Sequence, residues 1–527
     1  MSLPASALAP AGPSTSPPPL PRLANAYRVL EHGLDAAFGG AGNPLRQLGA
    51  LGFLLLWLLV ASGSILFIVL DTSAAGAYKS VDALAAVPWM LGTALRGLHR
   101  YAADALVLVM GLHILREWLL GRYRHWRRMI WWTGVPLVGL AFVSAVGGFW
   151  LNWDRLGQYS VLATAQWLDA LPILAVPLSR NFLGDASLSD RLFTLFIFIH
   201  IGIPLLLVFG LWFHIQRISL AKVFPARPLA WAILLGLLAL ALVLPVRSQG
   251  PADLTSLPTA LALDWWLLFI HPLMDATSAT TVWVLLGLAF VLLALPPLLP
   301  TAARQPVAKV YPEHCSGCAR CFDDCPYSAI TMVAHPNGKP GMQLAQVSAD
   351  LCASCGICAG ACPSSTPFRS TEQLVTGIDM PQWPVHTLRR QLVEGLRALP
   401  GPRRLVVFGC DQGAQGRLDA PDALHLKLVC AGALPPSFIE YALRAGADAV
   451  LVNGCREGGC AFRLGQRWTD QRLTGAREPY LRPSVAQDRW RVAWTDMGDE
   501  AALAAALETL RQQCHSGTPS TPEESPR

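Results

Sequence analysis

Residues 96–116 read RGLHRYAADALVLVMGLHILR and place two histidines, His99 and His113, inside an apolar run long enough to enter a membrane. The 14-residue spacing returns to nearly the same face of an α-helix and separates the two rings by about 21 Å along its axis. A titratable side chain within hydrocarbon is costly and usually has a partner. The stretch therefore predicts a membrane helix with two ligands on one face at two depths, and haem iron is the obvious group for them to bind.

A second stretch repeats this spacing, because FIHIGIPLLLVFGLWFHIQR at 198–217 carries His200 and His214. One apolar segment lies between the two histidine-bearing segments, so both should cross the membrane in the same direction. We expect His99 to pair with His200 near the outer side and His113 with His214 near the inner side. A single buried histidine is as often a hydrogen-bonded core residue, but four at matching positions favour two stacked haem b sites.

The segments that flank these histidines carry glycines with the same period of 14. A missing side chain would let a flat macrocycle approach the helix backbone. The four haem-packing glycines predicted in this way are Gly49, Gly63, Gly134 and Gly148.

The composition indicates a multi-domain membrane protein, since 53% of the 527 residues are hydrophobic and only 14% are charged. The net charge of +6 comes from basic residues beside apolar spans, which argues for orientation in a bilayer and against nucleic-acid binding. Six segments approach the roughly 20 residues that a spanning helix needs. They lie near 47–70, 89–120, 130–151, 193–216, 229–246 and 281–299.

Basic residues predict the orientation of these spans, because cytoplasmic loops are rich in Lys and Arg. The two basic loops hold Arg116, Arg122, Arg124, Arg127 and Arg128, and Arg217, Lys222 and Arg227. We therefore expect both termini on the cytoplasmic side of a bacterial inner membrane. Residues 1–24 are rich in Pro, Ala and Ser and are expected to be a disordered tail, not a signal peptide.

Residues 25–300 resemble cytochrome b of the quinol-oxidising bc complexes and their photosynthetic relatives. RGLHRYAADALVLVMGLH and WWTGVPLVGLAFVSAVGGFWLNWDRLGQYS carry the resemblance. It implies a dihaem bundle, a possible homodimer, and a role for Arg96 and Arg100 on the haem propionate side.

The resemblance also implies an outer quinone site in PADLTSLPTALALDWWLLFIHP, residues 251–272. Asp264, Trp265 and Trp266 stand in place of the family's Pro-Glu-Trp-Tyr signature, and Asp264 would accept a quinol proton as a general base. The sequence departs from the family at Leu263, Trp266 and Leu195. In the alternative interpretation, Asp264 and His271 form an interfacial polar pair beside tryptophan anchors.

All 13 cysteines lie at or after Cys315, in short-spaced groups that favour metal ligation over disulfides. CSGCARCFDDCP and CASCGICAGACP each have the spacing of the bacterial two-cluster ferredoxins, in which the last cysteine of each run ligates the other cluster. One predicted [4Fe-4S] ligand set is Cys315, Cys318, Cys321 and Cys362, and the other is Cys352, Cys355, Cys358 and Cys325. Zinc sites usually show separated CxxC pairs, so zinc is disfavoured.

A third set of cysteines, Cys410, Cys430, Cys455 and Cys460, includes three that follow strand-like runs. Residues just past the ends of parallel strands converge at one sheet edge, so these four could hold a [2Fe-2S] cluster. Residues 403–514 resemble the delta subunit of methyl-viologen-reducing hydrogenase, although Gly413 replaces the second cysteine of that family's CxxC pair. The alternative is a set of buried free cysteines in an α/β core.

The sequence thus predicts a six-span helical membrane domain with a four-helix dihaem bundle, then a ferredoxin-like domain and an α/β parallel-sheet domain. The expected boundaries are a tail at 1–24, the membrane domain at 25–300, a linker at 301–308, the ferredoxin domain at 309–366, a connecting segment at 367–402, the α/β domain at 403–514 and a tail at 515–527.

No dinucleotide fingerprint and no nucleophile–base set is evident, so substrate chemistry should belong to a partner. We expect an electron-transfer subunit between the quinone pool and a cytoplasmic flavoprotein, or a heterodisulfide reductase-like or hydrogenase-like complex. Those partners follow from the delta-subunit resemblance. The alternative is an anchoring and wiring module without quinone chemistry of its own.

Overall fold

The computed structural model divides into two compact units, at residues 16–301 and at residues 302–527 together with 1–15. The described residues are 21–39, 42–123, 127–173, 175–182, 189–216, 223–256, 260–298, 306–337, 341–370, 374–400, 403–414, 422–456, 459–497 and 499–516. The predicted tail residues 1–20 and 517–527, most of the predicted linker, and Arg124, Arg217 and Lys222 lie outside them.

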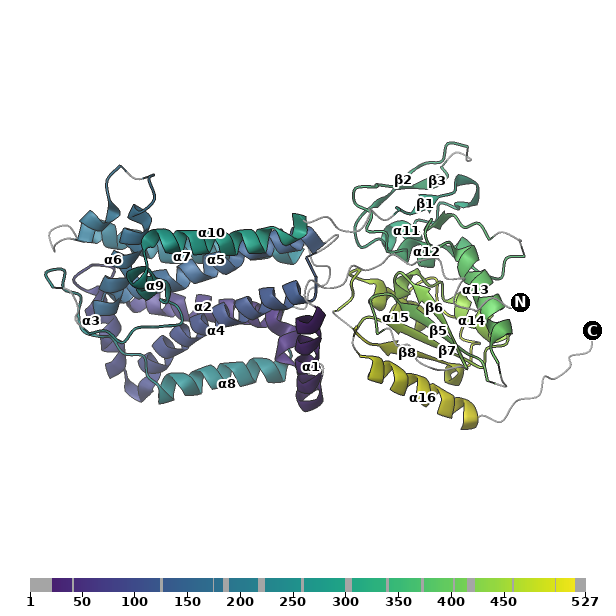
Figure 1. Cartoon of the computed structure of the whole chain (residues 1–527), viewed down its shortest axis with the longest axis horizontal. Helices are drawn as coiled ribbons and strands as arrows, with labels where there is room; N and C mark the ends of the chain where they lie inside the picture. Colours follow the sequence, from purple (N-terminus) through teal and green to yellow (C-terminus); the bar gives the residue numbers. More distant parts are fainter. Residues whose placement is uncertain are drawn as a thin grey trace, which may run out of the picture. The chain divides into compact units, whose positions relative to one another are not determined.

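The membrane unit is helical (Figure 1). Its long helices pack in pairs, α2 against α4 and α5 against α7, with α8 along α4. The main helices are α1 Pro21–Phe38, α2 Leu48–Val69, α4 Leu91–Leu119, α5 Arg128–Asn152, α6 Arg155–Asp169, α7 Asp190–Gln216, α8 Arg227–Val243 and α10 Ala279–Ala294, with short α3 Ala77–Asp82 and α9 Ile270–Ala276 between them.

Each of the six predicted apolar segments contains one long helix, but only part of the six-span prediction is confirmed. Within the described residues, four helical segments are long and apolar enough to cross a membrane: Pro44–Val69, Arg128–Asn152, Asp190–Gln216 and Ala279–Leu298. Helix α8 has 17 residues, which is short for a span. Helix α4 has 29 residues, but its sequence includes five charged side chains that lower its hydropathy.

The N-terminal boundary needs a correction, because α1 begins at Pro21, inside the predicted tail of residues 1–24. Proline suits the first turn of a helix, where its missing N–H would be unpaired anyway. Glu31 of α1 accepts a hydrogen bond from Arg116 Nε of α4 at 2.7 Å, and Arg46 also pairs with Asp35 of α1 at 2.7 Å. One buried and one partly buried ion pair thus hold a segment of modest hydrophobicity in place.

The ferredoxin part of the second unit consists of two small antiparallel sheets and short helices. Strand β2 Ile330–Ala334 pairs with β3 Gln343–Val347, and β1 Lys309–Val310 pairs with β4 Ile378–Asp379. The two cysteine runs contain α11 Arg320–Asp323 and α12 Ile357–Ala361. Strand β4 comes from the predicted connecting segment, so the ferredoxin domain extends beyond residue 366.

The α/β part contains the predicted parallel sheet. The strands are β5 Leu405–Cys410, β6 Ala423–Leu428, β7 Ala449–Gly454 and β8 Trp490–Trp494, in the order β6-β5-β7-β8, and every adjacent pair is parallel. The helices are α13 Val385–Ala398, α14 Ser437–Arg444, α15 Gly465–Leu473 and α16 Glu500–Ser516. Because β5 and β7 are central and buried, their sequences LVVFGC and AVLVNG are nearly all apolar.

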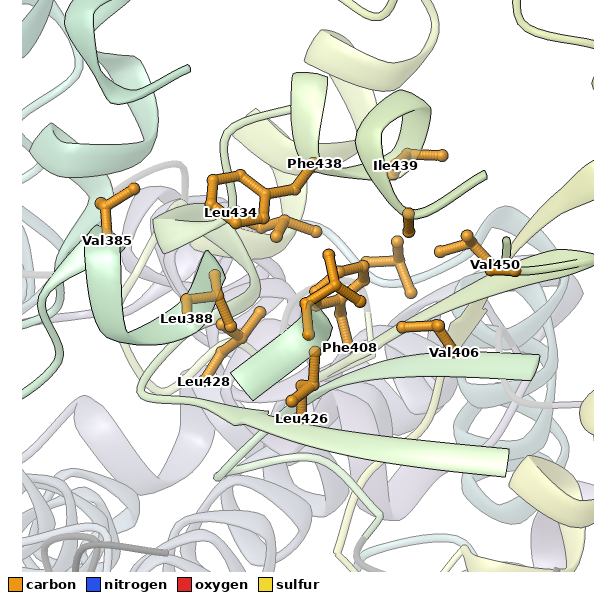
Figure 2. Close-up of a cluster of buried hydrophobic side chains, with 14 of the residues drawn as sticks. Val385, Leu388, Val406, Phe408, Leu426, Leu428, Leu434, Phe438, Ile439 and Val450 are labelled. Carbon is orange, nitrogen blue, oxygen red and sulfur yellow. The ribbon is translucent and has the colours of Figure 1, made fainter. Parts of the chain in front are cut away.

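One face of this sheet forms the main core (Figure 2). Phe408 and Val450 from the strands pack with Phe438 of α14, and Leu388 of α13 lies in the same cluster. Helix α13 therefore belongs to the α/β core although its residues lie in the predicted connecting segment. At the other end, α16 runs to Ser516, two residues into the predicted C-terminal tail.

Candidate functional site

The rings of the predicted outer pair of histidines lie close together in the membrane unit, at an interplanar angle of 69°. The rings of His99 on α4 and His200 on α7 have centroids 6.4 Å apart. Two metal–imidazole bonds of about 2 Å on opposite sides of one ion, together with the distance from each nitrogen to its ring centre, span about 6 Å. The spacing therefore fits two axial ligands of a single haem iron.

Each of the four predicted glycines faces one of the four histidines across a helix pair. A Cβ atom added to Gly63 would lie 3.0 Å from His99 Cε1, and one added to Gly134 or Gly148 would lie 3.1 Å from Cε1 of His214 or His200. At Gly49 the corresponding distance to His113 Cε1 is 3.6 Å. The sequence predicts that these glycines leave room for a macrocycle. In the structure, the group that approaches each glycine most closely is the histidine ring.

This close approach lets three of the rings hydrogen-bond to the facing helix through Nδ1. His200 Nδ1 donates to the Ser144 carbonyl at 3.0 Å, and His99 Nδ1 and His214 Nδ1 lie 2.9 and 3.1 Å from the hydroxyls of Ser62 and Thr133. A ring that uses Nδ1 in this way keeps Nε2 available as a metal ligand. Both hydroxyl residues directly precede a haem-packing glycine, as Ser62-Gly63 and Thr133-Gly134, a local signal that sequence reasoning missed.

The inner pair lies beside buried charges. His113 and His214 are close enough to interact electrostatically, and Glu117 and Arg116 are charged neighbours of His113. Arg116 Nη1 also donates to Glu117 at 2.9 Å. The sequence indicates Arg116 only as a loop residue that marks the cytoplasmic side. In the structure, it is a buried residue in the last turn of α4.

The two arginines predicted beside the outer haem point to different partners. Arg96 Nη2 donates to Ser248 Oγ at 2.9 Å and to Asn152 Oδ1 at 3.2 Å. Arg100 forms ion pairs with Asp104 and with Asp264, the predicted quinone-site carboxylate. Asp264 therefore has a charged side-chain partner in the structure.

Asp264 and His271, which the alternative interpretation pairs, have different hydrogen-bond partners in the structure. Asp264 Oδ1 accepts from the backbone N–H of Leu267 at 2.8 Å, whereas buried His271 lies 3.1 Å through Nε2 from Ser160 Oγ. Burial lowers the pKa of His271 to about 4, so the ring is neutral at physiological pH. Trp265 and Trp266 are both exposed, as tryptophan anchors would be.

The eight ferredoxin-type cysteines lie near one another. Cys321 lies near the other three members of the first set, and one of these, Cys362, comes from the second run. Cys355 interacts with Cys352 and with Cys325 from the first run. None of the described cysteines forms a disulfide. The fold thus brings together the two sets that would each ligate one cluster.

The third cysteine set converges at the carboxyl edge of the parallel sheet. Cys410 ends β5, Cys430 and Cys455 follow β6 and β7, and Cys460 lies in the next loop. The thiols of Cys410 and Cys460 each contact those of Cys430 and Cys455, and all four are buried. Gly413, at the position of the missing fifth cysteine, forms an isolated bridge with Asp496.

The donor chemistry of these sites fits iron–sulfur clusters. Burial raises the pKa of the thiols of Cys321 and Cys355 to about 12, so these thiols would become thiolates at neutral pH only when a cation binds them. Among the described residues, no three His, Cys, Asp or Glu side chains converge as ligands of one ion. A cluster differs from such a site because its cysteines bind different iron atoms, and a haem takes only two axial side chains.

Three family models match separate parts of the chain. The model described as cytochrome b/b6/petB matches residues 43–221, that of a 4Fe-4S dicluster domain matches 314–366, and that of the methyl-viologen-reducing hydrogenase delta subunit matches 406–516. These matches confirm the three resemblances inferred from the sequence. The chain therefore combines a cytochrome b-like membrane region, which implies haem b, with a dicluster region, which implies 4Fe-4S clusters, and a delta-subunit-like region.

Among solved structures, one titled "Hyperthermophilic respiratory Complex III" is similar at 18% sequence identity, with a TM-score of 0.40. The similarity covers 54% of this chain and 83% of that chain.

Proposed function

We propose that this protein is a membrane electron-transfer subunit that connects the quinone pool with a cytoplasmic redox partner. His99 and His200 would hold an outer haem b, and His113 and His214 an inner one. The two crossed ferredoxin sets would each hold a [4Fe-4S] cluster, and the third cysteine set a [2Fe-2S] cluster. When bound, these groups each change oxidation state by one electron.

One observation carries this proposal: four histidines on α4 and α7 each face a glycine on α2 or α5, at two levels of one helix bundle. A histidine with a structural role needs a hydrogen-bond partner, but it does not need a second histidine close by on a neighbouring helix. The Nδ1 contacts of Ser62, Thr133 and Ser144 fix the ring orientation that axial ligation requires.

The cytoplasmic partner we propose is a flavoprotein, or a heterodisulfide reductase-like or hydrogenase-like complex. The delta-subunit-like region supports it, because the matched family model is that of a hydrogenase subunit. Ferredoxin-type clusters generally have low potentials, so electron flow from the clusters to quinone is the simpler downhill direction. Both termini would then be cytoplasmic, with six spans in a bacterial inner membrane.

Spectroscopy of the purified full-length protein tests this proposal. Pyridine haemochrome analysis should give two haem b groups per chain, and adding a quinol or a quinone should change the redox state of one of them. A preparation whose haems respond to a cytoplasmic donor but not to quinones or quinone-site inhibitors would overturn the quinone part.

The second candidate is an anchoring and wiring module that only relays electrons to another membrane subunit. The ion pair between Arg100 and Asp264 favours it, because a carboxylate with a structural partner needs no quinol to explain its position. Asp264 also lies outside the residues 43–221 that match the cytochrome b model.

A pair of variants distinguishes the two candidates. Asp264→Asn removes the proposed proton acceptor, whereas Asp104→Asn removes the other carboxylate of Arg100 and is the matched control. If Asp264 is a general base, quinol turnover should fall by about 10²-fold or more in Asp264→Asn and little in Asp104→Asn. Equal, small effects would favour the wiring module.

A further inference from the structure

The third cysteine set lies against the second ferredoxin set and not against the first. Cys355 and Cys430 belong to one buried apolar cluster with Ile357, and Tyr327 and Trp468 pack against it. Cys460 is also a charged neighbour of Cys355. Cys321 of the first set, by contrast, lies near the other members of its own set and near Cys358 of the second set, and Cys318 of the first set is exposed. The three sets thus follow one another in space, with the second in the middle.

Three glycines make this close approach possible. A Cβ atom added to Gly360 would lie 2.2 Å from the Gly432 carbonyl oxygen, and one added to Gly432 would lie 2.9 Å from Ile357 Cγ1. At Gly465, the added atom would lie 2.1 Å from Cys430 Sγ. Gly360 follows a ligand of the second set, and the other two glycines flank the third set. The backbone segments on both sides of this seam are therefore in direct contact.

Arg472 of α15 crosses the seam and is completely buried. Its guanidinium donates to the Gly432 carbonyl at 2.8 Å, beside Cys430, and to the Ile357 carbonyl at 3.3 Å, between Cys355 and Cys358. It also forms an ion pair with Asp324, which directly precedes Cys325. One side chain thus contacts three of the segments that carry predicted iron ligands.

Further contacts hold the same two parts together. Trp468 Nε1 donates to the Asp324 carbonyl at 3.2 Å, and Arg477 pairs with the Asp324 carboxylate while stacking 3.6 Å over the Trp468 ring. A planar guanidinium has several N–H donors in fixed directions, so it can contact two carbonyls and a carboxylate at once better than an ammonium group can. Arg472 is the member of this network that reaches both cysteine sets.

We propose that the second ferredoxin set is the electron-transfer neighbour of the third cysteine set, and that Arg472 is the positioning residue that fixes their separation. This inference depends on one part of the proposed function, namely that the second and third cysteine sets both bind iron. The step moves one electron between the two sets, without forming or breaking a bond, and the cytoplasmic partner is the reductant. The first set, with exposed Cys318, would exchange electrons outside this seam.

The test compares Arg472→Gln with Arg467→Gln in the full-length protein, purified without oxygen. Arg467 lies on the same helix but is exposed. Iron and acid-labile sulfide content, electron paramagnetic resonance of the reduced protein and hydrogen exchange at 356–361 and 430–434 are measured on both. We expect Arg472→Gln to keep its iron, to lose the magnetic interaction between the second and third sets, and to exchange at least ten-fold faster in both segments. Arg467→Gln should match the unaltered protein.

Unchanged spin coupling and exchange in Arg472→Gln would overturn the proposal. If that variant does not accumulate, Arg472→Lys keeps the charge without the fork and should give a smaller rise in exchange, whereas no rise would contradict the role of Arg472. Loss of iron from both Arg472→Gln and Arg472→Lys would also overturn the proposal, because Arg472 would then be needed to assemble the iron sites. None of these measurements depends on quinone. Failure of the proposed quinone function can therefore be distinguished from failure of the proposed role of Arg472.

Discussion

The two halves of this molecule bring their predicted ligands together by opposite means. In the membrane half, four histidines lie on two helices. Each histidine ring packs against a glycine of a neighbouring helix. In the soluble half, twelve described cysteines lie mostly on loops, and the proposed ligation exchanges the last ligand of two runs. A helix fixes the distance between the two ligands that it carries. A loop instead brings the ligands of one site together, and the distance to the next site then depends on tertiary packing.

This difference has a consequence for substitution. Histidine sites 14 residues apart on rigid helices should respond independently, because each ring has its own glycine and its own partner helix. Cysteine sites that share loops should affect one another across the sequence. Substitutions in both halves test this contrast, and those that remove a whole cofactor should have the greatest effect.

Replacing one histidine should remove one haem and leave the other. In His113→Ala the inner haem is lost, and we expect the clusters to be disconnected from the membrane. In His99→Ala the outer haem is lost, and the clusters should still reduce the inner one. Pyridine haemochrome analysis should give about half of the full haem content in each case, and stopped-flow reduction measures the connection. Loss of both haems from either variant would show that the two sites are not independent.

Replacing Cys325 should damage a cluster whose other ligands lie about 30 residues later in the chain. Serine keeps the size of the side chain but is a poor iron ligand, so Cys325→Ser should lose or convert the cluster of Cys352, Cys355 and Cys358. Cys321→Ser, in the same run, should affect the other cluster. Electron paramagnetic resonance of the two variants should show complementary losses. The same missing signal in both would contradict the crossed ligation.

The sequence predicted those parts of the structure that have a period or a local motif. The histidine and glycine spacing depends only on helix geometry, so the pairing of His99 with His200 follows from the sequence alone. The strands that end at or just before Cys410, Cys430 and Cys455 follow from short apolar runs. Parallel strands then bring the three cysteines to one edge.

Contacts between distant segments could not be predicted in this way. Arg100 pairs with Asp264 across more than 160 residues, and Arg472 with Asp324 across 148, and neither pair leaves a spacing pattern in the sequence. Helix α1 was missed because the ion pairs of Glu31 and Asp35, and not its hydrophobicity, hold it in place. The role of the glycines was only partly foreseen, because sequence shows a missing side chain but not which group approaches it.

Adding a methyl group to a haem-packing glycine should weaken one haem site without removing a ligand. In Gly134→Ala the new Cβ would lie 3.1 Å from His214 Cε1, whereas Gly139→Ala, on the same helix, meets no atom within 4 Å. Overpacking of this kind costs about 1–3 kcal/mol, so the inner site should bind haem about ten-fold less tightly. Haem content and the redox potential of the inner haem are the measurements. If Gly139→Ala has the same effect, the helix and not the histidine contact is responsible.

Acidification should destabilise the outer end of the membrane half through His271. Burial lowers the pKa of this ring from 6.5 to about 4, with Asp275 as a weaker opposing influence. The unfolded chain therefore binds more protons than the folded one between these values, and stability falls as the pH drops from 6.5 towards 4. A pKa difference of this size corresponds to about 3 kcal/mol at the acid limit.

His271→Gln should remove this pH dependence, because a neutral amide has no proton to gain. Thermal denaturation of the outer haem spectrum, followed between pH 7.5 and pH 4.5, compares the variant with the unaltered protein. At pH 7.5 the variant and the unaltered protein should denature at the same temperature only if the amide replaces the contact with Ser160. The Ser160 hydroxyl lies 3.1 Å from His271 Nε2. The slopes should differ below pH 6.5 in either case, since the slope reports protons and not contacts. Parallel slopes would mean that other groups control the acid sensitivity of this half.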